Sequence, residues 1–445
     1  MRPLLIFAAC VGIYAADWPT ESGSPQRDGW AKSETGFTRD NVKRLELLYR
    51  YQAENQTRGP NALTTPMING RVITYRGFKE ELVFGGSSNN VFAIDADLNR
   101  LIWKRHFAEP QGGATAVCPG GLTAPVAMAG SSTAATGRGA TVGRGLAVPP
   151  RGGNRSGEFF AVSSDGYLHR VNTSTGEDRV PPIRFLPPNA KVSPLNVNDN
   201  AIYAATLDGC GGNPNQLYAF DLTENKIAAL SLSGNAVGTA IGTNGTVYAR
   251  TADAVLALAP KTLEPKDRFV LPGGTSAPVV FSWHDQDAIL AGGKDGRLVL
   301  LDSASFEKPL AETGPIGAEF RGAFASWLDP LTSTRWIYAS TASGILAWRL
   351  EDQAGKAVLI QDWTSKEIAN PAPPVTVNGL VFVLSERATL SILDSANGVE
   401  LYSTAASTWT NSGLAIANKR IYFTTHDNTV YCFGFFADQP QLTGR

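Results

Sequence analysis

The sequence predicts an all-β protein, an eight-bladed β-propeller of four-stranded antiparallel blades whose ring is closed by an N-terminal strand. One short β pattern recurs along nearly the whole chain, tight-turn signals separate its copies, and a further β run precedes the first copy. The composition, with Gly 45, Pro 27 and only 18% charged residues, is typical of a turn-rich β protein. Because 445 residues exceed one ordinary core, repetition of a small unit explains the length.

The repeat is clearest in a β run that usually ends in or near an aspartate. Its copies end 38 to 49 residues apart, except for a gap of 77 residues between the first two. The eight copies span residues 91–95, 168–172, 217–221, 255–259, 298–302, 345–349, 390–394 and 430–434. Units of roughly 40 to 45 residues are typical of propeller blades.

Turn and strand-start signals divide each unit into a meander. Asp295-Gly296 supplies the positive φ that a tight hairpin requires, and similar pairs recur in other units. Ala277-Pro278 places a proline at the first residue of a strand, where its missing N–H is tolerated. Each unit is therefore expected to be a short antiparallel sheet.

The two ends of the propeller are expected to meet in the last blade. The propeller spans residues 61–435, but its final unit lacks an outer strand. Residues 43–52, within an N-terminal segment 17–60, form a β run that can supply it. Because an unclosed ring would expose a sheet edge, we expect this strand to complete blade eight, followed only by a polar tail, 436–445.

The start of the chain predicts export. Residues 1–16 hold an arginine, the apolar run 4–14 and then the small residues Ala15 and Ala16, as in a signal peptide. The run is too short to span a bilayer. A periplasmic or secreted protein is expected; lipoprotein anchoring at Cys10 and a buried first strand are the alternatives.

Three cysteines remain outside the signal region. Cys118 precedes a strand of blade two, Cys210 lies in a turn of blade three, and both are expected on the same face of neighbouring blades. We therefore predict a disulfide between them, as an oxidising compartment allows. Cys432 lies in a core strand and is expected to be a buried thiol.

The insertion 129–158 is a low-complexity segment rich in glycine, serine and arginine. Such a composition does not bury a core of its own. Either it is a tolerated loop or it is a flexible arm that binds a partner.

The repeat resembles that of pyrroloquinoline-quinone (PQQ) propellers, the quinoprotein alcohol dehydrogenase-like family. Its best copy is Ala93-Ile94-Asp95 followed by Trp103, and 394–398 is a weaker one. The opening Asp17-Trp18-Pro19 also looks like the start of quinoprotein dehydrogenases. The resemblance implies the propeller fold but not one activity, because the family includes dehydrogenases and non-catalytic propellers such as the lipoprotein of outer-membrane barrel assembly.

The resemblance also implies which residue types would hold a cofactor, and the sequence can be compared with them. Family dehydrogenases hold the quinone between a tryptophan and a disulfide of adjacent cysteines, with calcium bound by Glu, Asn and Asp beside a catalytic Asp. Here no two cysteines are adjacent, and Glu319, in a Gly-Ala-Glu segment, stands outside the expected blade. We expect a non-catalytic or divergent member, without a metal site; PQQ with calcium stays an alternative.

Other chemistries lack a motif. The four histidines are scattered without the paired spacing of a zinc site, and no nucleophile elbow or phosphate-binding loop occurs. With 39 basic and 40 acidic residues and no charge runs, nothing indicates binding to nucleic acid, and no transmembrane segment is expected.

The candidate ligand site is the face on which the loops between blades converge. Arginines and an aromatic side chain there could hold a small anionic or quinone-like ligand, although the same residues could be solvated loop tips. The candidates are Arg76, Arg250, Lys294, Arg321, Arg387, Trp409 and Asn411.

The function predicted from these features is an exported scaffold that binds a protein partner or small ligand on the propeller face. The alternative is a divergent PQQ-dependent dehydrogenase that oxidises alcohols or sugars. Neither the partner nor the oligomeric state follows from the sequence.

Overall fold

The fold is known from a computed structural model that describes residues 16–436, with the exception of 75–76, 111–113, 117, 130–156, 213, 237 and 407. Arg76, most of the insertion 129–158 and nearly all of the tail 436–445 therefore lie outside the described residues. Among the described residues, no helix has the length and apolar content needed to cross a membrane.

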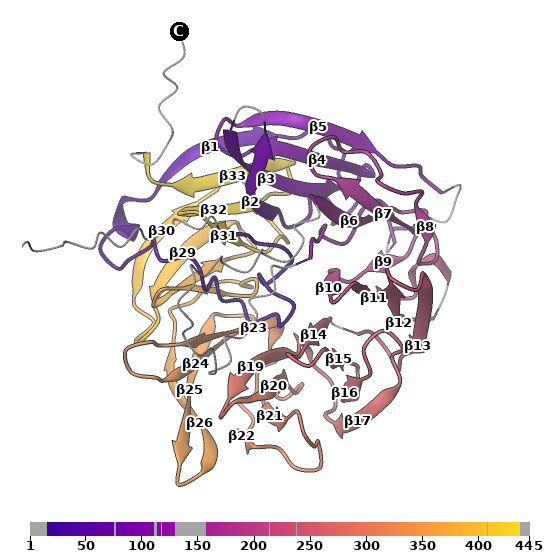
Figure 1. The fold of residues 1–445 in the computed structure, drawn as a ribbon. Coiled ribbons are helices and arrows are strands. Elements are labelled where there is room, and N and C mark those ends of the chain that lie inside the picture. The colour runs from indigo at the N-terminus through magenta and orange to yellow at the C-terminus, as the bar shows by residue number, and fades with distance from the viewer. Residues whose placement is uncertain are drawn as a thin grey trace, which may run out of the picture.

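The molecule is a ring of eight antiparallel blades, as the repeats predict (Figure 1). The first four blades follow one another along the chain. Blade 1 is β2 (Met67–Thr74), β3 (Gly77–Gly86), β4 (Asn90–Asp95) and β5 (Arg100–His106); blade 2 is β6 (Glu158–Val162), β7 (Tyr167–Asn172) and β8 (Ile183–Arg184); blade 3 is β10 (Asn196–Asn198), β11 (Ala201–Leu207), β12 (Gln216–Asp221) and β13 (Lys226–Ser231); blade 4 is β14 (Thr239–Ile241), β15 (Val247–Arg250), β16 (Ala254–Leu258) and β17 (Pro265–Val270).

The second half of the ring continues the pattern. Blade 5 is β19 (Val279–Trp283), β20 (Gln286–Gly292), β21 (Leu298–Asp302) and β22 (Ala311–Glu312); blade 6 is β23 (Arg321–Leu328), β24 (Arg335–Ser340), β25 (Ile345–Gln353) and β26 (Lys356–Thr364); blade 7 is β27 (Val375–Val377), β28 (Leu380–Leu384), β29 (Thr389–Asp394) and β30 (Glu400–Ala405); blade 8 is β31 (Ala415–Ala417), β32 (Arg420–Thr424), β33 (Thr429–Gly434) and β1 (Glu46–Gln52).

A few short elements complete the blades. Strand β9 (Lys191–Val192) pairs with β11, and β18 (Thr275–Ala277) runs parallel to β23. On the inner side of blade 2, Ala127 forms a single bridge with Phe160. Among the described residues, short 3₁₀ helices form at η1 (Val42–Arg44) and η2 (Cys210–Gly212).

Burial follows the position of a strand in its blade. The third strands β4 and β33 are buried at every residue, whereas the outer strands β13 and β17 alternate between exposed and half-buried side chains. A third strand is covered on both faces by neighbouring blades, which explains why the eight predicted copies read as near-continuous apolar runs.

Tryptophan and glycine of the repeat join neighbouring blades. Trp103 of blade 1 lies so close to Gly176 of blade 2 that a Cβ there would come within 2.6 Å of its ring, and its indole N–H donates to the carbonyl of Thr173 at 2.7 Å. Trp363 of blade 6 covers Gly398 of blade 7 in the same way. A side chain at either glycine would displace the indole that fills the junction.

The ring is closed by the predicted N-terminal strand. Strand β1 pairs with β33 from Glu46↔Gly434 to Gln52↔Thr429, with one irregularity between Leu47 and Tyr49. It is the outermost strand of blade 8, so the N-terminal segment and the C-terminal strand share one sheet.

Deleting residues 43–52 should therefore destroy cooperative folding of the whole ring. The deletion leaves β33 as an unpaired edge and removes apolar side chains that pack on the core of blades 7, 8 and 1. Circular dichroism and calorimetry should show no cooperative melting transition. Leu331→Ser, at a side chain that is 93% exposed, should melt as the unmodified protein does; a deletion variant with normal melting would contradict strand-mediated closure.

A buried carboxylate in blade 1 should make stability depend on pH. Glu81 is 1% exposed, and burial raises its pKa to about 8, an effect that Asn69 offsets only in part. Because the folded-state pKa lies above the unfolded value, stability should fall as pH rises from about 4.5 to 8.

Glu81→Gln should therefore be more stable than the unmodified protein at pH 8 and similar to it at pH 5. Urea denaturation at both pH values measures this difference. Glu54→Gln is the matched control, because the Glu54 carboxylate is 86% exposed and paired with Lys104. A Glu81→Gln variant whose stability depends on pH as that of the unmodified protein does would show that Glu81 is not the titrating group.

Candidate functional site

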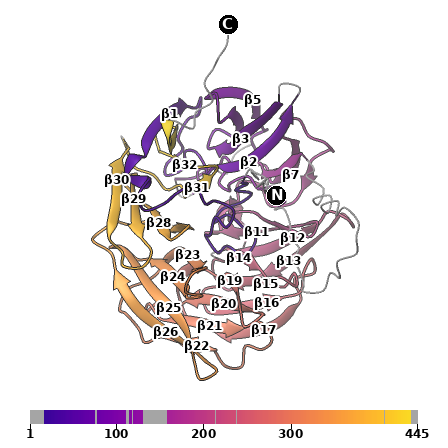
Figure 2. The same cartoon turned by 60° about the vertical axis from the view of Figure 1, so that its left-hand side comes forward.

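The segment 16–34 lies inside the ring and passes all eight blades in turn. Figure 2 shows it as the indigo chain near the centre of the ring. Its hydrogen bonds reach the innermost strands or their flanking residues, in chain order Asn418 of blade 8, Ile68 of blade 1, Met128 of blade 2, Leu195 of blade 3, Ile241 of blade 4, Val280 of blade 5, Ser326 of blade 6 and Thr376 of blade 7. We call residues 16–34 the channel segment.

Arg27 is the main side-chain anchor of the channel segment. It is 4% exposed, and its guanidinium donates to the carbonyl oxygens of Leu195 at 2.8 Å, Pro194 at 3.1 Å and Thr239 at 3.3 Å. It also donates to the carbonyl of Glu21. Burial lowers the pKa of Arg27 to about 10, and the nearby charge of Glu21 offsets part of that effect. The side chain thus ties blades 3 and 4 to the segment.

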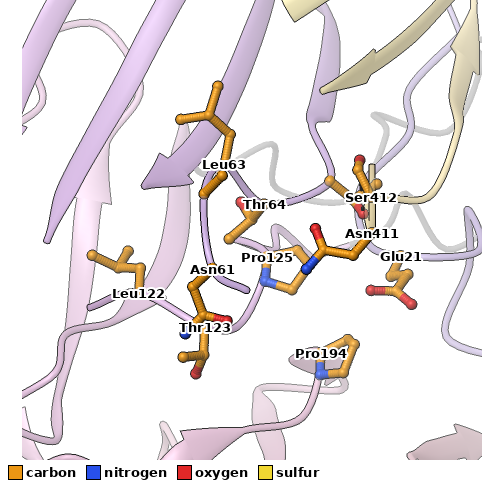
Figure 3. Close-up of a pocket in the computed structure, with 12 residues that line it drawn as sticks. Glu21, Asn61, Leu63, Thr64, Leu122, Thr123, Pro125, Pro194, Asn411 and Ser412 are labelled. Carbon is orange, nitrogen blue, oxygen red and sulfur yellow. Dashed lines mark hydrogen bonds between the residues drawn. The ribbon is translucent and has the colours of Figure 1, made fainter. Parts of the chain in front are cut away.

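Two adjoining cavities open where the channel segment meets the loops that precede the innermost strands. Their volumes are about 120 Å³ and about 380 Å³, and both are lined by Glu21, Thr65, Asn411 and Ser412. Figure 3 shows the smaller cavity, between blades 1, 2, 3 and 8. We call the two cavities together the channel mouth. The larger one also contacts Arg321, Asn370, Pro373, Glu386, Trp409 and Thr410.

Glu21 is the charged group common to both cavities. Burial raises its pKa above the ordinary 4.5, and the charge of Arg27 opposes that change. In the part of the chain that the structure describes, its carboxylate oxygens have no hydrogen-bond or ion-pair partner, since Arg27 donates to its backbone carbonyl instead. An unpaired carboxylate in a recessed site is costly, so a ligand that supplies positive charge would be favoured there.

Trp409 lies at the rim of the larger cavity and is held there by His426. Trp409 is 41% exposed and stacks on His426 with ring centroids 3.9 Å apart. An imidazole nitrogen of His426 lies 2.9 Å from the carbonyl oxygen of Gly59, and the Asn411 amide donates to the carbonyl of Pro60 at 2.9 Å. These contacts hold the rim of blade 8 against the chain that leads into blade 1.

The structure brings together three of the residues that the sequence predicted for the ligand site. Arg321, Trp409 and Asn411 all line the larger cavity. Lys294 and Arg387 are exposed but line neither cavity. Arg76 lies outside the described residues, so its place in the site stays a prediction.

Arg250 is not in a surface loop, which corrects the position expected for it. It is the last residue of strand β15 and is 0% exposed. Its guanidinium donates to the carbonyls of Thr251, Ala254 and Gly292, and burial lowers its pKa to about 10. Arg250 therefore serves the packing between blades 4 and 5.

The predicted disulfide joins blades 2 and 3 beside the channel mouth. Cys118 and Cys210 are bonded, with Cα atoms 5.5 Å apart and a sequence separation of 92. Cys432 is a buried free thiol, and burial raises its pKa to about 12. Both expectations for these cysteines are confirmed.

The channel segment and Glu21 are the features of the candidate site that sequence reasoning missed. The segment has no strand pattern, because its partners are backbone atoms of separate blades. One sequence signal could have indicated the segment, namely the glycines Gly23 and Gly29 close to the polar residues Arg27 and Asp28. In the structure both glycines have a positive φ, and both polar residues are buried.

The residues of the channel mouth do not fit PQQ with calcium. PQQ carries three carboxylates, whereas the described lining holds two carboxylates, Glu21 and Glu386, and a single cationic side chain, Arg321. Among the described residues, no group of three or more His, Cys, Asp or Glu could hold a metal ion. Glu319 is not among the residues that line either cavity. We therefore derive no reaction step through this cofactor.

Comparisons with known proteins agree with the resemblance found in the repeats. Residues 333–434 match the family model described as outer membrane protein assembly factor BamB. No curated protein matches the chain.

Solved structures similar to the chain include two quinohemoprotein alcohol dehydrogenases and a methanol dehydrogenase. ADHIIG from Pseudomonas putida HK5 has 12% sequence identity and a TM-score of 0.64 over 97% of this chain and 82% of that chain. The enzyme from Comamonas testosteroni has 14% identity and a TM-score of 0.63 over the same shares. A europium-containing methanol dehydrogenase has 10% identity and a TM-score of 0.65 over 94% of this chain and 98% of that chain. At these identities the likeness shows the fold.

Arg27→Met should destabilise the protein by about 3 kcal/mol or more. The change leaves the carbonyls of Leu195, Pro194 and Thr239 without the guanidinium that bonds them. Urea denaturation followed by fluorescence measures the loss. Arg100→Met, at an exposed residue of β5, should change stability by less than about 0.5 kcal/mol; equal effects of the two changes would contradict an anchoring role for Arg27.

Proposed function

We propose that the protein is an exported, non-catalytic scaffold whose channel mouth binds a cationic side chain of a partner polypeptide. The observation that carries the proposal is the carboxylate of Glu21, which both cavities share and which has no hydrogen-bond or salt-bridge partner among the described residues, although the charge of Arg27 acts on it. A cation would supply the missing interaction.

The lining supports a cationic group better than the anionic or quinone-like ligand expected from the sequence. Arg250 is buried elsewhere, so Arg321 is the one cationic side chain in a described lining that also holds Glu21 and Glu386. Trp409 is 41% exposed at the rim, with its ring stacked on His426, and an aromatic ring attracts an ammonium or guanidinium. A lysine or arginine side chain of a partner would meet both features.

The described lining also lacks the groups of a nucleophilic enzyme. No histidine or cysteine lines the two cavities. The hydroxyls of Thr410 and Ser412 donate to the carbonyls of Thr424 and Gly413 rather than to a carboxylate. Binding is therefore the activity that this arrangement supports best.

Export is the second part of the proposal. The apolar start of the chain and the Cys118–Cys210 disulfide support a periplasmic or secreted location, because such bonds persist in oxidising compartments. Anchoring through Cys10 is the alternative to a free protein.

Glu21→Gln should abolish binding of a cationic probe without harming the fold. Acetyl-trilysine amide should bind the unmodified protein saturably and Glu21→Gln at least about tenfold more weakly. Because the pKa of Glu21 is raised, affinity should increase with pH above 4.5 in the unmodified protein and stay flat in the variant. Calorimetric titration measures both.

Two controls make this test specific. Glu54→Gln removes an exposed carboxylate outside the mouth and should leave affinity unchanged. Glu21→Gln should be at least as stable as the unmodified protein at neutral pH, because the change removes an unpaired, recessed charge. Binding that survives in Glu21→Gln, or no binding by either protein, would refute the proposed ligand.

A divergent PQQ-dependent dehydrogenase is the second candidate, favoured by the likeness to alcohol and methanol dehydrogenases over at least 94% of the chain. The scaffold proposal predicts no saturable change in visible absorbance when PQQ and calcium are added, and no reduction of an artificial electron acceptor with alcohols or sugars. Saturable binding with turnover would establish the dehydrogenase instead.

A further inference from the structure

Ala16 lies in a polar site built by blades 1 and 8, away from the channel mouth. Its backbone N–H donates to the Oδ1 atom of Asn418 at 2.8 Å, and the Nδ2 atom of Asn418 donates back to the carbonyl of Ala16 at 3.2 Å. Ala16 is 6% exposed. Gly70 makes this approach possible, because a Cβ there would come within 2.1 Å of the Ala16 carbonyl oxygen. The chain is thus held at a specific residue, Ala16.

The same asparagine connects Ala16 to a buried carboxylate. The Nδ2 atom of Asn418 donates to Glu80 at 2.9 Å, and the hydroxyl of Tyr422 donates to the other carboxylate oxygen at 2.8 Å. Glu80 is 6% exposed, and burial raises its pKa to about 7 despite the nearby Arg420. The positive charge near Glu80 is therefore too small to offset the effect of burial on its pKa.

Three carboxylate side chains, Glu80, Asp97 and Asp17, belong to the residues around Ala16. Glu80 and Asp97 come from blade 1 and its outer turn, and Asp17 accepts a hydrogen bond from the N–H of Gly70 at 2.9 Å. Arg420 of blade 8 pairs with Asp97 at 2.8 Å and is the cation that acts on Glu80. A second positive charge beside Asn418 would favour the ionised form of Glu80, which accepts a hydrogen bond from the same asparagine.

We propose that this site holds the α-ammonium group of Ala16, formed when a signal peptidase cleaves the Ala15–Ala16 bond. Cleavage adds water across the amide: the hydroxyl joins the carbonyl carbon of Ala15, and the nitrogen of Ala16 gains hydrogen and is protonated at neutral pH. The ammonium keeps the donor already aimed at Asn418 and gains a charge that is connected to Glu80 through this asparagine. Ala15 lies directly before the bond and is a small residue, which suits such a peptidase; Ile13 lies two positions earlier.

The proposal places cleavage after Ala15, one residue before the end of the predicted signal segment 1–16. A signal of residues 1–16 would remove Ala16 and with it the reciprocal bonds to Asn418, whereas cleavage after Ala15 keeps them. The inference depends on export, which is part of the proposed function, but not on what the channel mouth binds.

The first test is the N-terminal residue of the exported protein. The full chain is expressed in a bacterium, the periplasmic protein is purified, and its first residue is determined by Edman degradation and intact mass. The proposal requires Ala16. A chain that begins at Asp17 or further along, or that retains Met1, would overturn it.

The second test compares two purified forms that differ in the group at the nitrogen of Ala16. One begins at Ala16, and the other carries Gly-Ser-Gly before Ala16, so that an amide replaces the ammonium. The form with the free ammonium should melt about 2 °C higher at pH 7. The gap should disappear when both forms carry Glu80→Gln, which keeps the shape of the side chain, and should persist when both carry the control Glu54→Gln.

Equal melting of the two forms, or a gap that Glu80→Gln leaves unchanged, would overturn the ammonium site. These outcomes are independent of acetyl-trilysine binding, so failure of this site and failure of the proposed ligand are distinguishable.

Discussion

The structure depends on satisfying the inner edges of eight sheets that face one channel. Each innermost strand presents backbone N–H and C=O groups toward the ring axis, where no further strand of its blade can pair with them. The channel segment supplies the missing partners one blade at a time. Ile68 exchanges two hydrogen bonds with Trp18, and the N–H groups of Ile241, Val280 and Thr376 donate to carbonyls of Pro25, Gln26 and Gly29. The N-terminal region thereby acts twice, since its later residues also close the ring as β1.

The same constraint creates the candidate binding site. A segment that follows the inner edges must bend back on itself, which the positive φ of Gly23 and Gly29 permits, and Glu21 lies in this bend. Its carboxylate is left in the channel mouth while Arg27 bonds its backbone. A recessed, unpaired charge lowers stability and is retained in proteins mainly at sites of function. A partner would then bind to the channel segment, which hydrogen bonds fix to the blades, rather than to exposed loop ends.

The sequence predicted features whose signals are local and periodic. The eight third strands, the closing strand at residues 43–52 and the Cys118–Cys210 pair follow from repeat spacing and turn residues, and the structure contains all three. Arg250 was placed in a loop because a strand end and a loop start look alike in sequence, and burial decides between them. The channel segment could not be predicted, because its partners are backbone groups on eight blades and carry no side-chain signature. The sequence predicted a mainly positive ligand site, whereas the described lining of the channel mouth holds two carboxylates and one cationic side chain.

The central claim is that a partner docks at the channel mouth, and site-specific photo-crosslinking in cells tests it most directly. A benzophenone side chain is introduced at Asn411, on the mouth, and in a second protein at Ile227, an exposed side chain on an outer strand. We predict a crosslinked partner from position 411 that Glu21→Gln abolishes, and none from position 227. Crosslinks from position 227 alone, or from position 411 regardless of Glu21, would contradict the account.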